Sequence, residues 1–119
     1  MYYIVLDLEF NQDFSSLQRL DLKGNRSLLE IIQIGAVKLD NNLNTIDSFN
    51  RYIKPSIYAK VSEFITELTG ITTEQLMKEK EFPQVYHEFT QFIGNKDSIM
   101  CIWGLSDIKE LFKNAKYHC

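Results

Sequence analysis

The segment that decides the fold is YYIVLDLEF, residues 2–10. It is dense in aromatic, aliphatic and β-branched residues, which is typical of a buried strand. Side chains alternate between the two faces of a strand, so the acids Asp7 and Glu9 share one face and their apolar neighbours share the other. We expect this strand to lie at the centre of a sheet, with two carboxylates at its end.

Two further apolar segments, at residues 30–39 and 46–53, predict strands that follow the first as an antiparallel meander. The connection between the first two strands, residues 11–29, is long for a hairpin, and long loops are often functional. Its positive residues are Arg19, Lys23 and Arg26. They could contact nucleic-acid phosphates, or they could simply face solvent.

The middle of the chain changes to helical patterns. Residues 60–68 predict a short helix that Thr69 and Gly70 end, and Thr72 predicts the N-cap of the next helix. Pro83 suits the first turn of a third helix, whose apolar face is formed by Val85, Phe89, Phe92 and Ile93.

Residues 98–103 predict a fourth strand, and Ser106 can cap a last helix, whose apolar face is formed by Ile108, Leu111, Phe112 and Ala115. A strand that is reached through helices can lie parallel to the first. The order of elements therefore predicts an α/β domain: a mixed sheet with three antiparallel strands and one parallel strand, flanked by helices.

The length of 119 residues suits one domain, and 45% apolar with 24% charged residues indicates a globular chain. The net charge of −3 provides no global positive field, so affinity for nucleic acid would have to come from local sites. Neither cysteine belongs to a metal-binding cluster, and no signal peptide or membrane span is recognised. We expect a cytoplasmic protein that does not bind membranes.

The candidate chemistry lies in three acids. Asp7 and Glu9 would repel each other on so apolar a strand, and a divalent cation with a preference for oxygen ligands would remove that penalty. Asp107 falls in the first turn of the last helix, and it would join them if the first and fourth strands are neighbours. The alternatives are that the two strand acids are merely solvated and that Asp107 serves the helix dipole.

Four stretches in this order resemble the DEDD exonuclease superfamily, which has an RNase H-like fold: DLEF at Asp7–Phe10, EIIQIGAV at Glu30–Val37, LTGIT at Leu68–Thr72 and WGLSDIKEL at Trp103–Leu111. The resemblance implies a 3′–5′ exonuclease that hydrolyses phosphodiester bonds at the 3′ ends of single-stranded DNA or RNA. It implies that Asp7, Glu9 and Asp107 hold two divalent cations, Mg²⁺ or Mn²⁺. It also implies that the 3′-terminal nucleotide is positioned by main-chain groups of Phe10, Thr69, Gly70 and Ile71.

The chain departs from that family at its end. The family's third motif is a His followed five residues later by an Asp, and His118 is followed only by Cys119. His118 is therefore predicted to be a helix-end residue and His87 a surface residue. We expect residues 1–119 to form a single exonuclease-like domain that stops before its last strand and helix, as an incomplete or inactive fragment.

Two further expectations follow from the missing motif. A non-catalytic module of the same fold, which binds nucleic acid or a protein, is the alternative function. The surface that truncation would expose predicts association into a homo-oligomer. A phosphoryl-transfer domain with a nucleophilic Asp is disfavoured, because that chemistry usually uses D-x-D and this strand has D-x-E.

Overall fold

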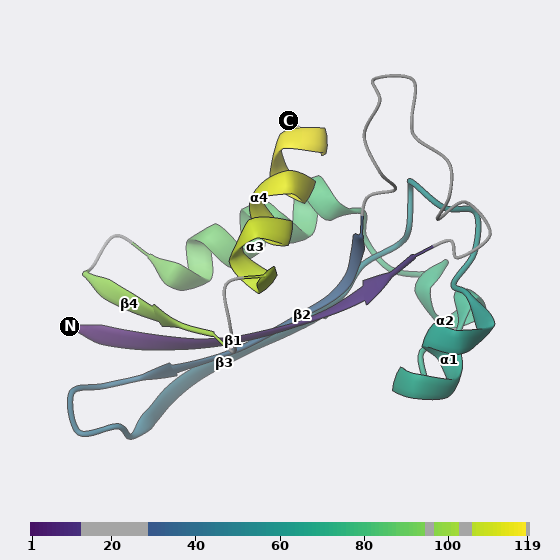
Figure 1. Ribbon diagram of the computed structural model, residues 1–119. Helices are drawn as coiled ribbons and strands as arrows, with labels where there is room; N and C mark the ends of the chain where they lie inside the picture. The colour runs from purple at the N-terminus through teal and green to yellow at the C-terminus, as the bar shows by residue number, and fades with distance from the viewer. Residues whose placement is uncertain (13–28, 95–96, 103–105, 119) are drawn as a thin grey trace.

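A four-stranded mixed sheet with the strand order β3-β2-β1-β4 forms the centre of the molecule (Figure 1). The computed structural model describes residues 1–12, 29–94, 97–102 and 106–118. Its strands are β1 (Tyr2–Asn11), β2 (Glu30–Leu39), β3 (Thr45–Tyr52) and β4 (Ser98–Cys101). The pairings β1–β2 and β2–β3 are antiparallel, and β4 lies parallel to β1, so the predicted mixed sheet is confirmed.

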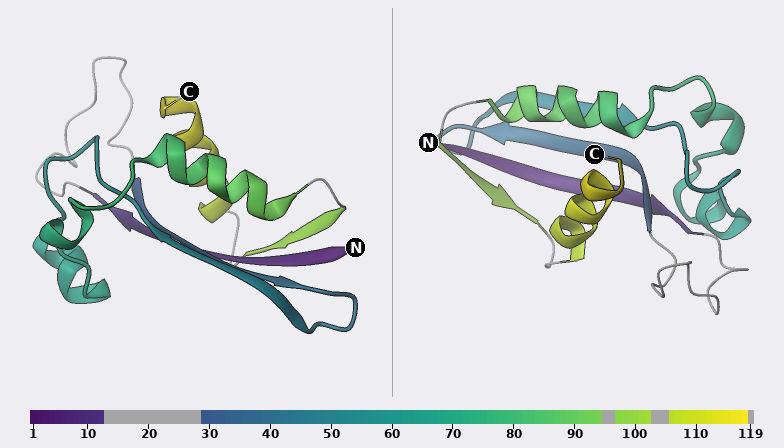
Figure 2. Two further views of the ribbon diagram at one scale, coloured as in Figure 1. Left: turned by 180° about the vertical axis from the view of Figure 1, so that it is seen from behind. Right: turned by 90° about the horizontal axis from the view of Figure 1, so that it is seen from above.

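Helices cover one face of this sheet. They are α1 (Glu63–Thr69), α2 (Thr73–Leu76), α3 (Phe82–Ile93) and α4 (Ser106–His118). Figures 1 and 2 show α3 and α4 on one face, with α1 and α2 gathered at the far end of the sheet. The described helices leave the middle of the opposite face uncovered, and there the side chains of Val5 and Ile99 are 39% and 43% exposed.

The main core lies between the sheet and the helices α3 and α4. Ile4, Leu6 and Leu8 of β1 point into it, and Leu6 is only 1% exposed. They belong to one cluster with the predicted apolar face of α3, which comprises Val85, Phe89, Phe92 and Ile93. Burial of a side chain of this size contributes about 1.5–3 kcal/mol, so this face of β1 stabilises the fold.

The last helix turns a narrower face to the core than its sequence predicts. Leu111 is buried, and Ile108 and Ala115 pack against the same cluster. Phe112 is 62% exposed, so its predicted place in the core is wrong. The three inward residues recur at the helical spacing of three and four, and Phe112 lies beside this stripe on the solvent side.

A β-bulge connects the sheet to a second, smaller core. The pairing of β1 with β2 passes from Glu9–Gln33 to Phe10–Ile31, so Ile32 has no partner in the register. Bulges re-aim side chains, and the fully buried Ile32 packs against the α1–α2 segment, through Val61, Ile65, Ile71 and Leu76. This second core holds α1 and α2 at the end of the sheet.

Caps set the bounds of the short helices. Ser62 accepts a hydrogen bond from Ile65 N, so α1 begins at Glu63 rather than at the predicted residue 60. Gly70 ends α1 with a φ of 78°, a left-handed conformation that favours glycine. Thr72 caps α2 as predicted, because its side chain accepts from Gln75 N.

Two predictions fall on parts of the chain outside the described residues. The positive residues of the long connection, Arg19, Lys23 and Arg26, lie there, and so does the start of the WGLSDIKEL stretch, Trp103–Leu105. Among the described residues, no helix combines the length and the apolar character needed to cross a bilayer.

Candidate functional site

Two acids project from the uncovered face of β1. Asp7 is exposed and Glu9 is half-buried, whereas Leu6 and Leu8 between and beside them are buried in the main core. The sequence predicted this division of the strand, and the structure confirms it. Because the described helices α3 and α4 pack on the apolar face, neither carboxylate is buried beneath them.

A third acid approaches from the beginning of α4. Strand β4 runs parallel to β1 and pairs with it as far as Val5 and Cys101. The chain then leaves the sheet, and Asp107 lies in the first turn of α4. The end of β4 and the start of α4 thereby bring Asp107 towards the segment of β1 that carries Asp7.

The electrostatics of the site show that the three carboxylates act on one another. Burial is the main cause that raises the pKa of Glu9, and the charges of Asp7 and Asp107 raise it further. Burial also raises the pKa of Asp107, and the charge of Asp7 adds to the effect. Asp7 is thus the carboxylate that both others sense, and among the described residues no positive charge is a cause of the pKa shift of Glu9 or Asp107.

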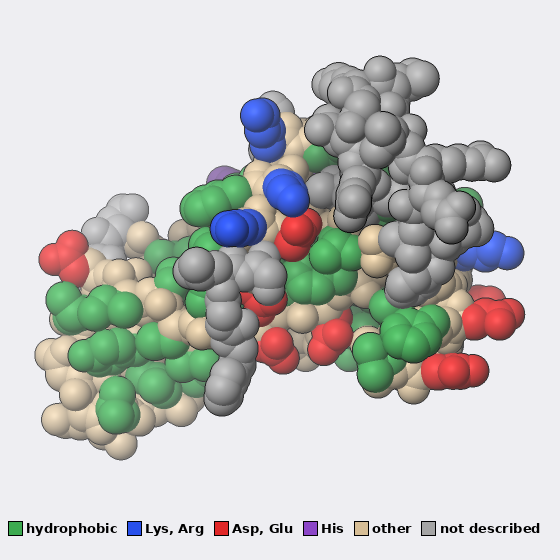
Figure 3. Space-filling view, in the orientation of Figure 1, with side chains coloured by type: hydrophobic (Ala, Val, Ile, Leu, Met, Phe, Trp, Pro, Cys, Tyr) green, Lys and Arg blue, Asp and Glu red, His purple; other side chains and the backbone are tan. Residues whose placement is uncertain are grey.

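Figure 3 shows acidic side chains gathered over the middle of this face, beside a broad apolar area. A site that contains only carboxylate oxygens and uncompensated negative charge suits a hard divalent cation. The three acids are nevertheless not tightly clustered, since within the described ranges no three His, Cys, Asp or Glu side chains come close enough to hold a metal ion. The donor chemistry fits a cation, and ligation by all three would require their side chains to turn inwards.

The end of α1 and the turn that follows it, here called the Thr69–Ile71 loop, contain three of the predicted substrate-binding residues. Gly70 is exposed, Thr69 is half-buried and Ile71 is buried in the second core. The N–H of Gly70 donates to Thr66 O, and that of Ile71 donates to Thr69 Oγ1. Both donors therefore already have partners in α1, and the exposed backbone of Gly70 is the part that a ligand can approach.

Phe10, the fourth predicted substrate-binding residue, follows the bulge of β1. Its side chain is half-buried and packs against the main core. Its side chain therefore contributes to the fold, and any ligand contact would come from its backbone, as predicted.

Two residues opposite the strand acids complete the floor of the site, and neither was predicted to belong to it. Gln33 pairs with Glu9, and Gly35 pairs with Asp7. Gln33 Nε2 donates to Asn50 Oδ1 over 2.9 Å, which extends a polar surface to β3. A Cβ at Gly35 would lie 3.7 Å from Asp7 O, so the fold tolerates a larger residue, and glycine leaves the area beside Asp7 open.

Both histidines lie away from these acids. His87 is exposed on α3, as predicted. His118 ends α4, where its ring stacks on Phe82 at 4.9 Å. Burial lowers the pKa of His118, against the opposing charges of Glu30 and Glu81, so this helix-end residue favours its neutral form.

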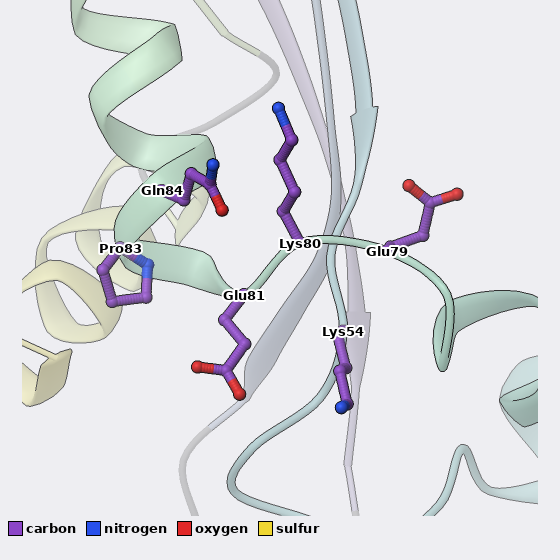
Figure 4. Close-up of a pocket in the computed structure, with 6 residues that line it drawn as sticks. All are labelled: Lys54, Glu79, Lys80, Glu81, Pro83 and Gln84. Atoms are coloured by element: carbon purple, nitrogen blue, oxygen red, sulfur yellow. The ribbon is translucent and has the colours of Figure 1, made fainter.

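A separate hollow of about 450 Å³ lies where the chain enters α3 (Figure 4). Its lining residues come from the segment after β3, the turn before α3 and the first turn of α3: Lys54, Glu79, Lys80, Glu81, Pro83 and Gln84. It is open, mixes positive and negative side chains, and contains none of the three site acids. We therefore place the functional site at the acids and not in this hollow.

Comparisons with known proteins agree with the fold. The model of the family described as Exonuclease (RNase_T) matches residues 4–115. The mouse protein 3′-5′ exoribonuclease 1 is 37% identical over 71 residues, which are 59% of this chain and 21% of that protein. The PolC-type DNA polymerase III of Streptococcus pyogenes is 32% identical over 97% of this chain and 8% of its own length.

Among solved structures, the nuclease domain of 3′hExo, a DEDDh family member bound to rAMP, superposes with a TM-score of 0.79. It is 25% identical, and the match covers 98% of this chain and 59% of that chain. This chain spans about a fifth of the length of the curated relative with which it shares 37% identity. It belongs to the exonuclease family RNase_T and, with that family, to the DEDD superfamily of 3′–5′ exonucleases, which has an RNase H-like fold.

Proposed function

We propose that this protein is a metal-dependent 3′–5′ exonuclease that removes nucleotides from the 3′ ends of single-stranded RNA or DNA. The observation that carries the proposal is the mutual electrostatic effect of Asp7, Glu9 and Asp107 on the uncovered face of the sheet. In a chain of the exonuclease family, uncompensated carboxylates at this position fit cation-assisted hydrolysis of a phosphodiester bond.

The three acids are the proposed cation ligands, and Asp7 is the residue that the two cations would share. Asp7 fits this role because its charge raises the pKa of both Glu9 and Asp107. Bound Mg²⁺ or Mn²⁺ would supply a water of lowered pKa and stabilise the negative charge on the leaving 3′-oxygen. The carboxylates themselves stay ionised more readily when a positive charge lies between them.

The 3′-terminal nucleotide is proposed to lie between these acids and the Thr69–Ile71 loop. The exposed Gly70 backbone and the main chain of Thr69, Ile71 and Phe10 would contact it. A related nuclease domain is bound to rAMP, which supports a site for a single nucleotide in this fold. The open surface at Gly35 leaves space beside Asp7 for the sugar and phosphate.

A digestion assay tests the proposal directly. Single-stranded RNA and DNA of one sequence, labelled at the 5′ end, are incubated with the protein and Mn²⁺. We expect stepwise shortening from the 3′ end, which EDTA abolishes and a 3′-phosphate slows. Asp7→Asn should remove the activity, whereas Asp47→Asn, which changes an exposed acid of β3, should retain it.

The second candidate is a non-catalytic module that binds single-stranded nucleic acid. It is favoured by the positions of the two histidines, because neither lies at the acids to act as a general base. This module would bind the same oligonucleotides in a salt-sensitive manner without shortening them. That result would contradict the catalytic proposal, and the absence of both binding and digestion would contradict both candidates.

A further inference from the structure

Three buried polar side chains lie where β1 and β2 meet the rest of the chain. Among the described residues they are the buried polar or charged ones: Asn11 and Asn114 at 0% exposure and Glu30 at 2%. Asn11 and Glu30 are partners in the β1–β2 register. Neither belongs to the proposed cation site, and both direct their hydrogen bonds to residues 56–62, here called the anchored loop.

Glu30 holds the first part of the anchored loop by its charge. Its carboxylate accepts from Ser56 N and Ile57 N, both over 2.8 Å, and from Tyr58 N over 3.2 Å. Three consecutive amides can converge on one carboxylate only if the backbone adopts a defined concave conformation. Burial of a charge is a weak source of stability, so what these bonds chiefly provide is a fixed shape.

Asn11 holds the last part of the same loop. Its Nδ2 donates to Lys60 O over 3.1 Å, and its Oδ1 accepts from Ser62 N over 3.0 Å. Ser62 is in turn the N-cap of α1, whose other end leads into Thr69 and Gly70. The side chain of Asn11 therefore attaches the start of α1 to the end of β1.

The anchored loop sets the position of the α1–α2 segment relative to Asp7 and Glu9. Asn11 lies two residues after Glu9 on β1, so the same strand carries a cation ligand and the attachment of α1. The second core, through Ile32 and Ile71, adds apolar contact at the same end of the sheet. Together these contacts relate the Thr69–Ile71 loop to the acids of β1.

We infer that Glu30 and Asn11 are positioning residues that hold the Thr69–Ile71 loop at the distance from Asp7 and Glu9 at which a 3′-terminal nucleotide can be bound. The inference rests on the proposed function, because it assigns that loop to the nucleotide. It predicts that disturbing Glu30 weakens nucleic-acid binding while the cation site on β1 stays intact.

The test compares wild type with Glu30→Gln, which keeps the size of the side chain and removes its charge. Hydrogen exchange should become at least tenfold faster at Ser56–Tyr58, while the amides of β1 and β2 keep their protection. Affinity for a single-stranded oligonucleotide should fall about tenfold, the effect of losing about one charge-assisted hydrogen bond in the site. Affinity for Mn²⁺ alone should not change. General destabilisation would lower the affinity for both ligands, so it would not produce a loss confined to the oligonucleotide.

Two variants complete the design. Glu67→Gln, on the exposed side of α1, should match wild type in every measurement. Glu30→Asp keeps the charge but cannot reach all three amides, so it should give a smaller loss, and it serves as the test if Glu30→Gln does not fold.

Two results would overturn the inference alone: unchanged oligonucleotide affinity in a folded Glu30 variant, or unchanged exchange at Ser56–Tyr58. A parallel loss of Mn²⁺ affinity would also overturn it, because Glu30 would then act on the whole sheet. A wild-type chain that binds no oligonucleotide contradicts the proposed function, and the inference falls with it.

Discussion

The two faces of β1 differ in what they contribute. On one face, Ile4, Leu6 and Leu8 are between 0% and 5% exposed and pack in the main core. On the other, Asp7 is exposed and Glu9 is half-buried, and burial, with added repulsion from Asp7 and Asp107, raises the pKa of Glu9. Burial of the apolar face contributes enough free energy for the fold to tolerate repulsion among the acids on the other face. Single substitutions on this strand should therefore separate stability from chemistry.

The largest effect is expected from Leu6→Ala on the buried face. The substitution removes a side chain that is 1% exposed and leaves a cavity, so it should lower the free energy of unfolding by about 2–5 kcal/mol. Val5→Ala, one residue away on the uncovered face, should lower it by less than about 1 kcal/mol. Urea denaturation of both variants measures the difference. Equal effects would contradict the assignment of one buried face and one uncovered face to β1.

A smaller loss is expected where α4 attaches to the sheet. Asn114 accepts from Ile31 N and donates to Leu29 O, over 3.1 and 2.9 Å. Asn114→Ala would remove the side-chain partner of the buried Ile31 N and of the partly buried Leu29 O, and should lower the free energy of unfolding by about 1–3 kcal/mol. The neighbouring exposed change Lys113→Ala is the control in the same denaturation experiment. A loss no larger than that of the control would show that α4 is held by apolar contacts alone.

On the acidic face, removal of a charge should stabilise the protein. Asp7→Asn relieves the repulsion on Glu9 and Asp107 and should raise the free energy of unfolding by about 0.5 kcal/mol, a size typical of exposed charge pairs. The same variant should lose activity, so stability and function would change in opposite directions. Thermal unfolding without divalent cations measures the first change, and a clear decrease in stability would contradict the repulsion.

The smallest expected effect is the pH dependence of the gain in unfolding free energy that Asp7→Asn produces. The pKa values of Glu9 and Asp107 are raised by folding, so these groups destabilise the fold at neutral pH and cease to do so once protonated. The stability difference between Asp7→Asn and wild type should therefore shrink from neutral pH to about pH 4. Unfolding free energies at several pH values measure it, and a gain that grows on acidification would have the wrong sign.

Much of the fold could be predicted because local signals agreed with one another. The apolar run of β1, the glycine after α1 and the cap at Thr72 each indicated the element that the structure contains. The inward face of α4 was only partly predictable, because Phe112 fits a helical apolar stripe as well as its buried neighbours do. Which apolar residues are buried depends on what packs against them, and here Phe112 is left exposed.

The placement of the three acids could be predicted from the sequence, and the contacts of the residues around them could not. The D-x-E spacing was enough to place Asp7 and Glu9 on one face, while the approach of Asp107 followed from an assumed strand order. The role of Glu30 could not be read from the sequence, since its partners are backbone amides 26–28 residues away. The bulge at Ile32 was equally hidden, because it depends on the register between two strands.

The most direct measurement of the central claim is a titration with Mn²⁺ followed by NMR. A paramagnetic ion broadens the amide signals of nearby residues, so binding at the proposed site should broaden those of Asp7, Glu9 and Asp107 together. Asp7→Asn and Asp107→Asn should each remove the broadening at all three positions. Broadening that spares Asp107, or that persists in either variant, would contradict a cation site built from these three acids.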